Sequence, residues 1–234
     1  MTWTTKTRSR ARALLPSIAL LAGTVGLAAC DNKDDILAVI VPNPTPVVTT
    51  FKDPAFNFAT LHTFAMPDTV IHFDPVTGTP LSVTRQFDAA TLNQVRQNLL
   101  ARGYTEVGDP GTTQPSFVVL VGASATQNYN AFIGYPWFAT WGFYNGWGWY
   151  APGFDNSWAI VYPWYPNSDV VTYDRGTLVV TIVPTLSVNP LAKSIGAAWA
   201  GVATSLLTDG VTQNGINAAI NQMFLQSPYL TATP

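Results

Sequence analysis

The hydrophobic positions near the middle of this 234-residue chain repeat with the period of a helix. Apolar residues at the first, fourth, eighth and ninth positions of one stretch share a helical face: Leu92, Val95, Leu99 and Leu100. Asp88 precedes them, where a carboxylate can cap the free amide hydrogens of a first turn, and Gly103 can supply a left-handed stop. The pattern therefore predicts a helix over residues 89–102.

A second helical pattern lies near the C-terminus. Its apolar face consists of Ile216, Ala219, Ile220, Met223 and Phe224. Thr212 or Asn214 can cap the first turn, and Ser227-Pro228 stops the helix because proline cannot continue it. This is the last element that the pattern predicts.

Three stretches have the composition of strands. Residues 58–66 mix aromatic residues with threonine and leucine, and Pro67 follows them. Residues 116–126 and 177–183 contain runs of valine, leucine and isoleucine that are typical of buried strands. Residues 67–86 carry three prolines and a glycine, so we expect mainly a loop there.

Residues 191–207 fit two patterns at once. One helical face would carry Leu191, Ile195, Ala198, Trp199, Val202 and Leu206. A strand would instead place Trp199, Gly201 and Ala203 on one side and the residues between them on the other. Periodicity alone does not choose between helix and strand.

The order of these elements is strand, helix, strands and helix. It predicts an α+β domain in which two helices cover one face of a mainly antiparallel sheet. We expect a single domain over residues 51–230, with a long aromatic and glycine-rich insertion at residues 128–168. The domain has about 180 residues, which is enough to bury a core.

The insertion concentrates the aromatic residues of the chain. Residues 129–165 hold 16 of the 29 aromatic side chains and six of the eight tryptophans, and no charged residue occurs between Asp109 and Asp155. Frequent glycine and proline preclude a long helix, so we expect a long hairpin or extended loop between two core strands. Three interpretations stay open. The loop folds back on the sheet or pairs with a partner chain, it contacts a membrane interface, or it binds sugars or peptides. The expected contact residues are Trp137, Trp141, Trp147, Trp149, Tyr150, Trp158 and Trp164.

The charged residues are few and unevenly placed. They make up 10% of the chain, against about 25% in typical soluble proteins. Four of the 11 basic residues precede residue 13, and all 13 acidic residues follow Cys30. A basic start followed by an uncharged apolar run over residues 14–27 is the layout of a secretory signal peptide. The run is shorter than the roughly 20 residues that a spanning helix needs.

The apolar run ends in Leu27-Ala28-Ala29-Cys30, which resembles a bacterial lipobox. The resemblance implies that residues 1–29 are a lipoprotein signal peptide cut between Ala29 and Cys30. It also implies a diacylglyceryl group on the Cys30 thiol and an acyl chain on its amino group, which together would hold the protein on a bilayer. Ordinary secretory cleavage after Ala29, or an uncleaved anchor, is the alternative. Cleavage would leave seven basic and 13 acidic residues, a net charge of −6.

Residues 30–50 are expected to form the acylated cysteine and a flexible tether, because the stretch starts polar and contains three prolines. Residues 36–41 interrupt it with six apolar residues, which would form a first strand or pack on the membrane. Asp31 resembles an inner-membrane retention signal, whereas Lys33-Asp34-Asp35 resembles a surface-export signal, and a plain solvated linker is the alternative. We therefore expect a lipid-anchored envelope location, with the membrane and the leaflet left open.

Short motifs occur in a recognisable order between residues 50 and 229. They are the 58–66 segment, Leu99-Leu100-Ala101-Arg102-Gly103-Tyr104 at the end of a helix, the 117–121 strand, Gly176-Thr177-Leu178-Val179-Val180, Trp199-Ala200-Gly201, and a terminal helix closing in Ser227-Pro228. The set resembles the bacterial lipoprotein family with domain of unknown function 4136. The resemblance implies that residues 197–207 form a strand, and it implies no activity. The chain departs from the family at Ala200, where a basic residue is usual, and at Pro184-Thr185, where an aspartate is usual.

Candidate chemistry is sparse. His62 and His72 are the only histidines, and Asp68 and Asp74 lie near them in sequence. Zinc generally takes three or four protein ligands, and the single cysteine is assigned to the lipid, so we expect no metal site. We find no nucleophile elbow and no glycine-rich phosphate loop before a lysine. The sequence shows no basic face for nucleic acid, and one cysteine excludes an intrachain disulfide.

These observations predict a non-enzymatic, lipid-anchored bacterial envelope protein. The acyl anchor would contact the bilayer, and the aromatic segment would interact with the membrane surface or with an envelope partner. No cofactor is expected apart from the covalent lipid at Cys30. A glycan-binding or hydrolytic envelope module is the alternative function.

Overall fold

The computed structural model describes residues 46–74, 81, 84–107, 113–124, 129–131, 159–161, 171–173, 176–206 and 212–232. The chain divides into two units, Met1–Ile40 and Val41–Pro234, and every described residue belongs to the second. The predicted signal peptide, Cys30 and most of the predicted tether lie outside the described residues. Within the described residues, no helix is long and apolar enough to cross a membrane.

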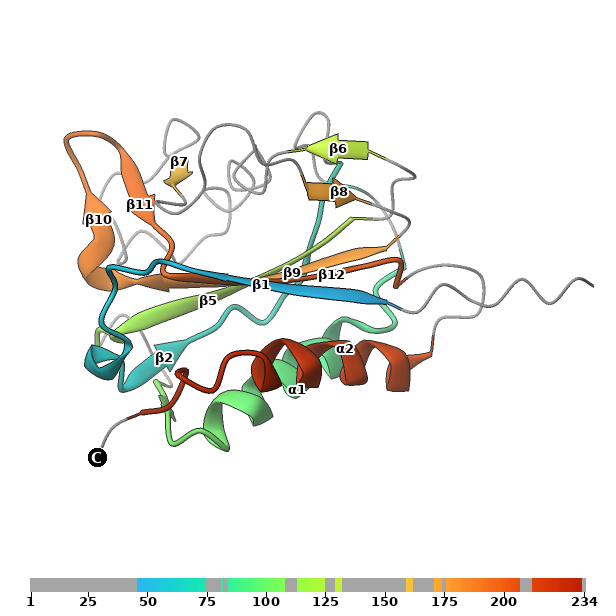
Figure 1. Ribbon diagram of the computed structural model, residues 1–234, viewed down its shortest axis with the longest axis horizontal. Coiled ribbons are helices and arrows are strands. Elements are labelled where there is room, and N and C mark those ends of the chain that lie inside the picture. Colours follow the sequence, from blue (N-terminus) through green and yellow to red (C-terminus); the bar gives the residue numbers. More distant parts are fainter. Residues whose placement is uncertain are drawn as a thin grey trace, which may run out of the picture. The chain divides into compact units, whose positions relative to one another are not determined.

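A seven-stranded sheet forms the centre of the described part of the chain (Figure 1). Its strands follow the order β1 (Val47–Lys52), β12 (Trp199–Thr204), β9 (Thr177–Pro184), β5 (Phe117–Ser124), β2 (Thr63–Ala65) and β4 (Thr105–Glu106), and β3 (Ile71–His72) also pairs with β5. Every residue of β9 is buried. Because side chains alternate between the two faces of a strand, both faces of the sheet are covered at β9.

The sheet is mixed rather than mainly antiparallel throughout. β1, β12, β9 and β5 pair antiparallel with one another in that order, whereas β2 pairs in parallel with β4 and β5, and β3 pairs in parallel with β5. The predicted α+β class is confirmed. The parallel part arises because α1 (Asp88–Leu100) connects β2 and β3 to β5, and a crossover of this kind returns the chain in the same direction.

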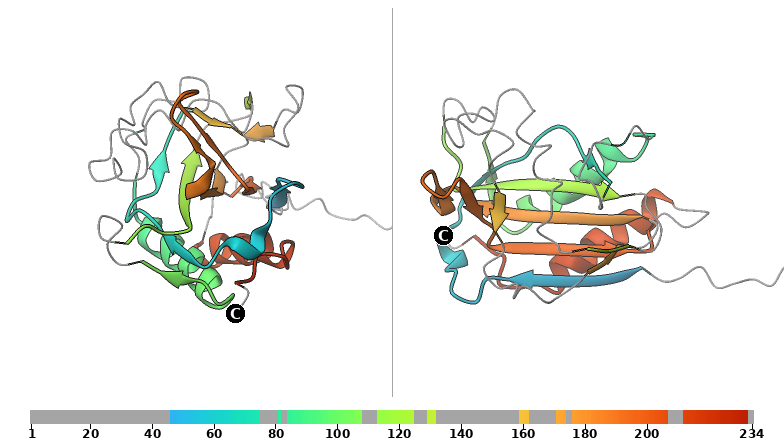
Figure 2. Two further views of the ribbon diagram at one scale, coloured as in Figure 1. Left: turned by 90° about the vertical axis from the view of Figure 1, so that its left-hand side faces the viewer. Right: turned by 90° about the horizontal axis from the view of Figure 1, so that it is seen from above.

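Both helices, α1 and α2 (Gln213–Leu225), lie on one face of the central sheet, as predicted (Figures 1 and 2). The predicted apolar residues of α2 are all buried, and so are those of α1 except Leu100, which is 41% exposed. Gly103 has a φ of 85°, which confirms the predicted stop after α1. The Thr212 hydroxyl accepts a hydrogen bond from the Gly215 N–H at 3.3 Å and caps α2.

Residues 58–66 do not form one strand, contrary to the prediction. A short 3-10 helix, Phe58–Thr60, comes first, and β2 begins only at Thr63. Asn57 causes the turn, because its side-chain oxygen accepts from the Ala59 N–H at 3.2 Å and its carbonyl oxygen accepts from the Thr60 N–H at 3.2 Å. Asparagine often bends the chain in this way, and the aromatic pattern conceals it.

Two element boundaries also differ from the prediction. Phe87, not Asp88, is the N-cap residue of α1, and no side chain caps this helix. Asp88 instead binds two basic side chains, which are described below. At the other boundary, β1 begins at Val47 and so occupies part of the stretch predicted to be tether.

The alternative left open for residues 191–207 is settled in favour of a strand, since β12 occupies Trp199–Thr204. β12 pairs with β1 on one side and β9 on the other. Residues 194–196 form a separate strand before it, β11 (Ser194–Gly196). The resemblance to the family, rather than periodicity, had indicated this result.

Two small sheets lie on the side of the central sheet opposite to the helices (Figure 1). One contains β10 (Val188–Asn189), β11 and β7 (Ala159–Val161), and the other contains β6 (Tyr129–Ala131) and β8 (Val171–Tyr173). β6 and β8 are antiparallel, with Ala131 opposite Val171. The residues predicted to form the insertion, 128–168, come between the antiparallel neighbours β5 and β9 in the sequence, and most of them lie outside the described residues.

Candidate functional site

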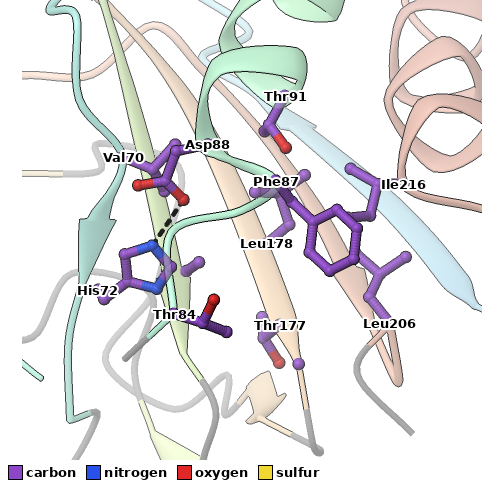
Figure 3. Close-up of a pocket in the computed structure, with 12 residues that line it drawn as sticks. Val70, His72, Thr84, Phe87, Asp88, Thr91, Thr177, Leu178, Leu206 and Ile216 are labelled. Atoms are coloured by element: carbon purple, nitrogen blue, oxygen red, sulfur yellow. Dashed lines mark hydrogen bonds and ion pairs between the residues drawn. The ribbon is translucent and has the colours of Figure 1, made fainter. Parts of the chain in front are cut away.

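A pocket of about 350 Å³ lies between the central sheet and the first turns of the two helices (Figure 3). This volume is within the range of small-molecule sites, which starts at about 300 Å³. The apolar part of the lining consists of Val70, Phe87, Ala123, Leu178, Leu206 and Ile216. The rest of the lining consists of His72, Thr84, Asp88, Thr91, Gly176 and Thr177. The lining comes from segments that are far apart in sequence.

Two left-handed residues shape the wall of the pocket. The chain turns into β9 at Gly176, with a φ of 76°, and leaves β12 through Ser205, with a φ of 62°. The Leu206 N–H donates to the Gly176 carbonyl oxygen at 2.8 Å, which joins the two turns. Leu206 is thereby held near Ile216 in the first turn of α2, and the Phe87 ring lies beside both (Figure 3).

The Asp88 carboxylate joins two basic side chains at the more exposed side of the pocket. Its Oδ1 lies 2.8 Å from His72 Nε2, and its Oδ2 lies 3.0 Å from Arg85 Nη1. Arg85 Nη1 also donates to the Val70 carbonyl oxygen at 3.2 Å. Because a carboxylate only accepts, His72 donates the hydrogen of this contact from Nε2. The network fixes β3 to the start of α1.

The other end of the helix–sheet interface is filled. Trp199 is fully buried, and its Nε1–H donates to Ser227 Oγ at 2.8 Å. Gly201 lies on the same face of β12, where an added Cβ would come within 2.7 Å of Trp199 Cη2 and 2.8 Å of Met223 Sδ. The Trp199-Ala200-Gly201 motif and the serine after α2 are therefore one packing unit that seats α2 on β12.

Two further polar side chains, Arg102 and Tyr104, lie just after the end of α1. Arg102 Nη2 donates to the carbonyl oxygen of Phe224, and its guanidinium carbon lies 5.1 Å from the centre of the Phe224 ring. The Tyr104 hydroxyl is buried and has no hydrogen-bond partner among the described residues. Burial raises the pKa of Tyr104 to about 12, although the Arg102 charge acts in the opposite direction. Burial also lowers the pKa of Arg102.

Most residues predicted to carry function lie outside the described residues. These are Ala29, Cys30, Trp137, Trp141, Trp147, Trp149, Tyr150, Trp158 and Trp164. His62 is exposed, whereas His72 lines the pocket and pairs with Asp88 rather than with Asp68 or Asp74. In the described part of the chain, no group of three or more histidine, cysteine or acidic side chains is placed to hold a metal ion.

Sequence reasoning missed the pocket and the His72–Asp88–Arg85 network. Asp88 had a sufficient local explanation as a helix cap, which concealed its pairing with His72, 16 residues earlier. One signal was present: Arg85 and Asp88 are three residues apart at the start of a predicted helix, the spacing of an ion pair. Nothing local indicates that Leu178, Leu206 and Ile216 converge.

Comparisons with known proteins identify a family and a fold. The family model described as "Domain of unknown function (DUF4136)" matches residues 47–229. A crystal structure of a DUF4136 family protein from Bacteroides thetaiotaomicron is similar, with a TM-score of 0.57 and 20% identity over 80% of this chain and 98% of that chain. No curated protein matches the sequence.

More distant structures resemble the fold only weakly. The PelC dodecamer from Paraburkholderia phytofirmans aligns over 80% of this chain and 99% of its own, with a TM-score of 0.36 and 6% identity. A PDZ domain protein from Parabacteroides distasonis aligns over 79% of this chain and 36% of its own, with a TM-score of 0.41 and 10% identity. The match of the family model over most of the chain decides the assignment, and the protein belongs to the DUF4136 family.

Proposed function

We propose that the protein is a non-enzymatic, lipid-anchored bacterial envelope protein that contacts a membrane surface through its aromatic segment, residues 129–165. The observation that carries the anchor is Leu27-Ala28-Ala29-Cys30 at the end of a basic and apolar leader. The position of the domain supports it, because β1 and the family match both begin at Val47. The stretch from Cys30 to Val47, fully extended, would reach roughly 55 Å from the membrane surface.

The contact role of the aromatic segment is supported by composition and by the fold around its ends. Tryptophan and tyrosine favour the membrane interface, where the ring is buried and the polar atom stays hydrated. Ala131 and Val171, which are opposite each other in the β6–β8 pair, flank residues 132–170, and within that stretch β7 pairs with β11. The β6–β8 pair lies on the side of the sheet away from the helices (Figure 1).

The anchor is tested by Cys30→Ala in the full chain, expressed in a bacterial host. We expect metabolic labelling with an alkyne fatty acid to be lost and the unprocessed precursor to accumulate. Ala29→Ser keeps a small residue at the cleavage site and is the matched control, which should still be labelled and processed. Unchanged labelling and processing of Cys30→Ala would contradict the lipid anchor.

The contact role is tested by tryptophan fluorescence of the protein with anionic phospholipid vesicles and with soluble oligosaccharides. A blue shift with vesicles alone supports membrane contact. A response to oligosaccharides alone favours the alternative, a glycan-binding or hydrolytic module, and no response contradicts both. Trp199→Phe is the control, because Trp199 is fully buried and its loss should leave the vesicle response unchanged.

A further inference from the structure

The pocket between the sheet and the helix starts has an apolar interior. Phe87, Leu178 and Ile216 lie deep between the two layers, and Leu178 and Ile216 are each only 5% exposed. The volume of the pocket is about 350 Å³. A group of the size of a water molecule occupies about 30 Å³ in a liquid. The space therefore holds a chain of roughly a dozen non-hydrogen atoms. Apolar side chains offer water no hydrogen bonds, so an apolar ligand is favoured over water there.

Three of the polar side chains that line the pocket, His72, Asp88 and Thr84, lie on the left of Figure 3, whereas Thr91 and Thr177 lie nearer its centre. The His72 and Asp88 side chains are 12% and 15% exposed, and Thr84 is exposed. In the view of Figure 3, Asp88 lies above the His72 ring and Thr84 lies below it. Because Asp88 uses Nε2–H, the other ring nitrogen is Nδ1, and the Thr84 hydroxyl can donate or accept. This side can bind one polar end group of a ligand.

The charge of this side is balanced within the protein. Asp88 pairs with Arg85 at 3.0 Å, and His72 donates to the other carboxylate oxygen. The Asp88 and Arg85 charges therefore compensate each other within the network. A neutral hydroxyl group suits this side, because it can donate a hydrogen bond to a ring nitrogen or accept one from it, whereas a second anion would lie close to the Asp88 carboxylate.

We propose that the pocket is a binding site for a neutral amphiphile: an acyl or similar apolar chain of about a dozen atoms that carries a hydroxyl group. The chain lies between Phe87, Leu178 and Ile216, and the hydroxyl forms a hydrogen bond with His72 Nδ1. The proposal does not depend on the lipid anchor or on the aromatic segment, because the pocket is formed by the helix side of the sheet.

The test is photoaffinity labelling of the full-length protein in membranes with a ten-carbon alcohol that carries a diazirine. Labelled peptides are mapped by mass spectrometry, and unlabelled 1-decanol, decanoate and decane compete at equal concentrations. We expect labels on the segments that contain Val70, Phe87 and Ile216, with 1-decanol the strongest competitor. Labels spread over the surface would overturn the site. Equal competition by decane, or stronger competition by decanoate, would overturn the neutral hydroxyl ligand.

Two substitutions examine the apolar and polar parts separately. Ala123→Leu adds three carbon atoms to the lining and should weaken competition by 1-decanol at least about fourfold, since each methylene group that loses its room costs about that factor. Ala192→Leu places the same change on an exposed residue and should have no effect. If Ala123→Leu does not accumulate, Thr91→Leu narrows the same cavity from α1. Unchanged competition in a folded cavity-filling variant would overturn the proposal.

For the polar part, His72→Gln keeps an N–H near the Nε2 position for Asp88 but removes Nδ1, the ring nitrogen proposed to bind the hydroxyl. It should weaken competition by 1-decanol about threefold to tenfold, the range of one hydrogen bond, and leave competition by decane unchanged. Equal losses for the alcohol and the alkane would overturn the role of His72 in binding the hydroxyl.

Discussion

At one end of the helix–sheet interface the Trp199 indole fills the space between β12 and α2, whereas at the other end the Phe87 ring borders a cavity of about 350 Å³. The same two layers form both ends. At the filled end the sequence supplies the largest side chain together with a glycine that makes room for it, Gly201. At the hollow end it supplies alanine, threonine and an ion-paired network.

The difference teaches that the family motif and the pocket have separate tasks. Trp199, Gly201 and Ser227 hold α2 against the sheet. Substitutions at these residues should therefore lower the free energy of unfolding. The pocket residues leave volume unfilled, which a core optimised only for stability would avoid, because protein interiors are otherwise close-packed. Substitutions at the two ends should therefore have different consequences.

Trp199→Ala should have the largest effect. It removes a fully buried indole and leaves the Ser227 hydroxyl without its donor. We expect a loss of about 4 kcal/mol in the free energy of unfolding, measured by urea titration of circular dichroism. Phe87→Ala is the matched truncation at the hollow end and should cost less than half as much. Equal losses would mean that the two ends are packed alike.

Gly201→Ala should come next. The added methyl group would lie under 3 Å from both the Trp199 ring and the Met223 sulfur, so one of them must move. We expect a loss of about 2 kcal/mol in the same measurement. A variant as stable as the parent protein would show that the contact of β12 with α2 is looser than these distances indicate.

Tyr104→Phe should stabilise the protein by about 1 kcal/mol near neutral pH, because it removes a buried hydroxyl that has no partner among the described residues. The gain should grow at high pH. The pKa of Tyr104 is raised from 10.0 to about 12 in the folded protein, so between pH 10 and pH 12 the unfolded chain loses this proton more readily and the parent protein loses stability as the pH rises.

The check is the difference between the two free energies of unfolding at pH 9 and pH 11. A difference that stays constant would contradict the raised pKa. Arg102→Lys serves as a comparison, since it keeps the positive charge near Tyr104 but loses the planar group that lies against the Phe224 ring.

Ala123→Val should have the smallest effect, and in the favourable direction. It adds two methyl groups at the hollow end, where the side chain faces the pocket. We expect a gain of about 0.5 kcal/mol, as is common for cavity-filling substitutions. Gly201→Ala adds less volume and should cost stability, so opposite signs for the two substitutions would support the comparison. A clear loss for Ala123→Val would weaken it.

The parts of the fold that periodicity predicts are those with strong local patterns. The apolar faces of α1 and α2 and the runs of β5 and β9 were correct within a few residues. The prediction of one strand over residues 58–66 was wrong because Asn57 forms a turn through its own hydrogen bonds, which outweigh the strand composition. The helix after β2 indicates parallel pairing of this strand, whereas the sequence pattern as a whole predicted a mainly antiparallel sheet.

The candidate site could not be predicted because its walls come from distant segments. Val70, Asp88, Leu178 and Ile216 belong to four separate stretches of chain. Each of these residues also has an ordinary local explanation, as a core residue or as a cap. Antiparallel pairing places Leu178 of β9 opposite Ala203 of β12. The left-handed residues Gly176 and Ser205 then turn the chain at that end of the two strands, and a serine gives no local signal of such a turn.

Because β1 lies at one edge of the central sheet, the resistance of the domain to a pulling force depends on the direction of the pull. The chain reaches the sheet through residue 46 and is held there by six residue pairs between β1 and β12, beginning at Val47↔Thr204. Ladder hydrogen bonds lie perpendicular to the strands. A pull along the strand must therefore shear all six pairs together, whereas a sideways pull opens them one after another. A force applied through the preceding chain would be resisted strongly in the first direction and weakly in the second.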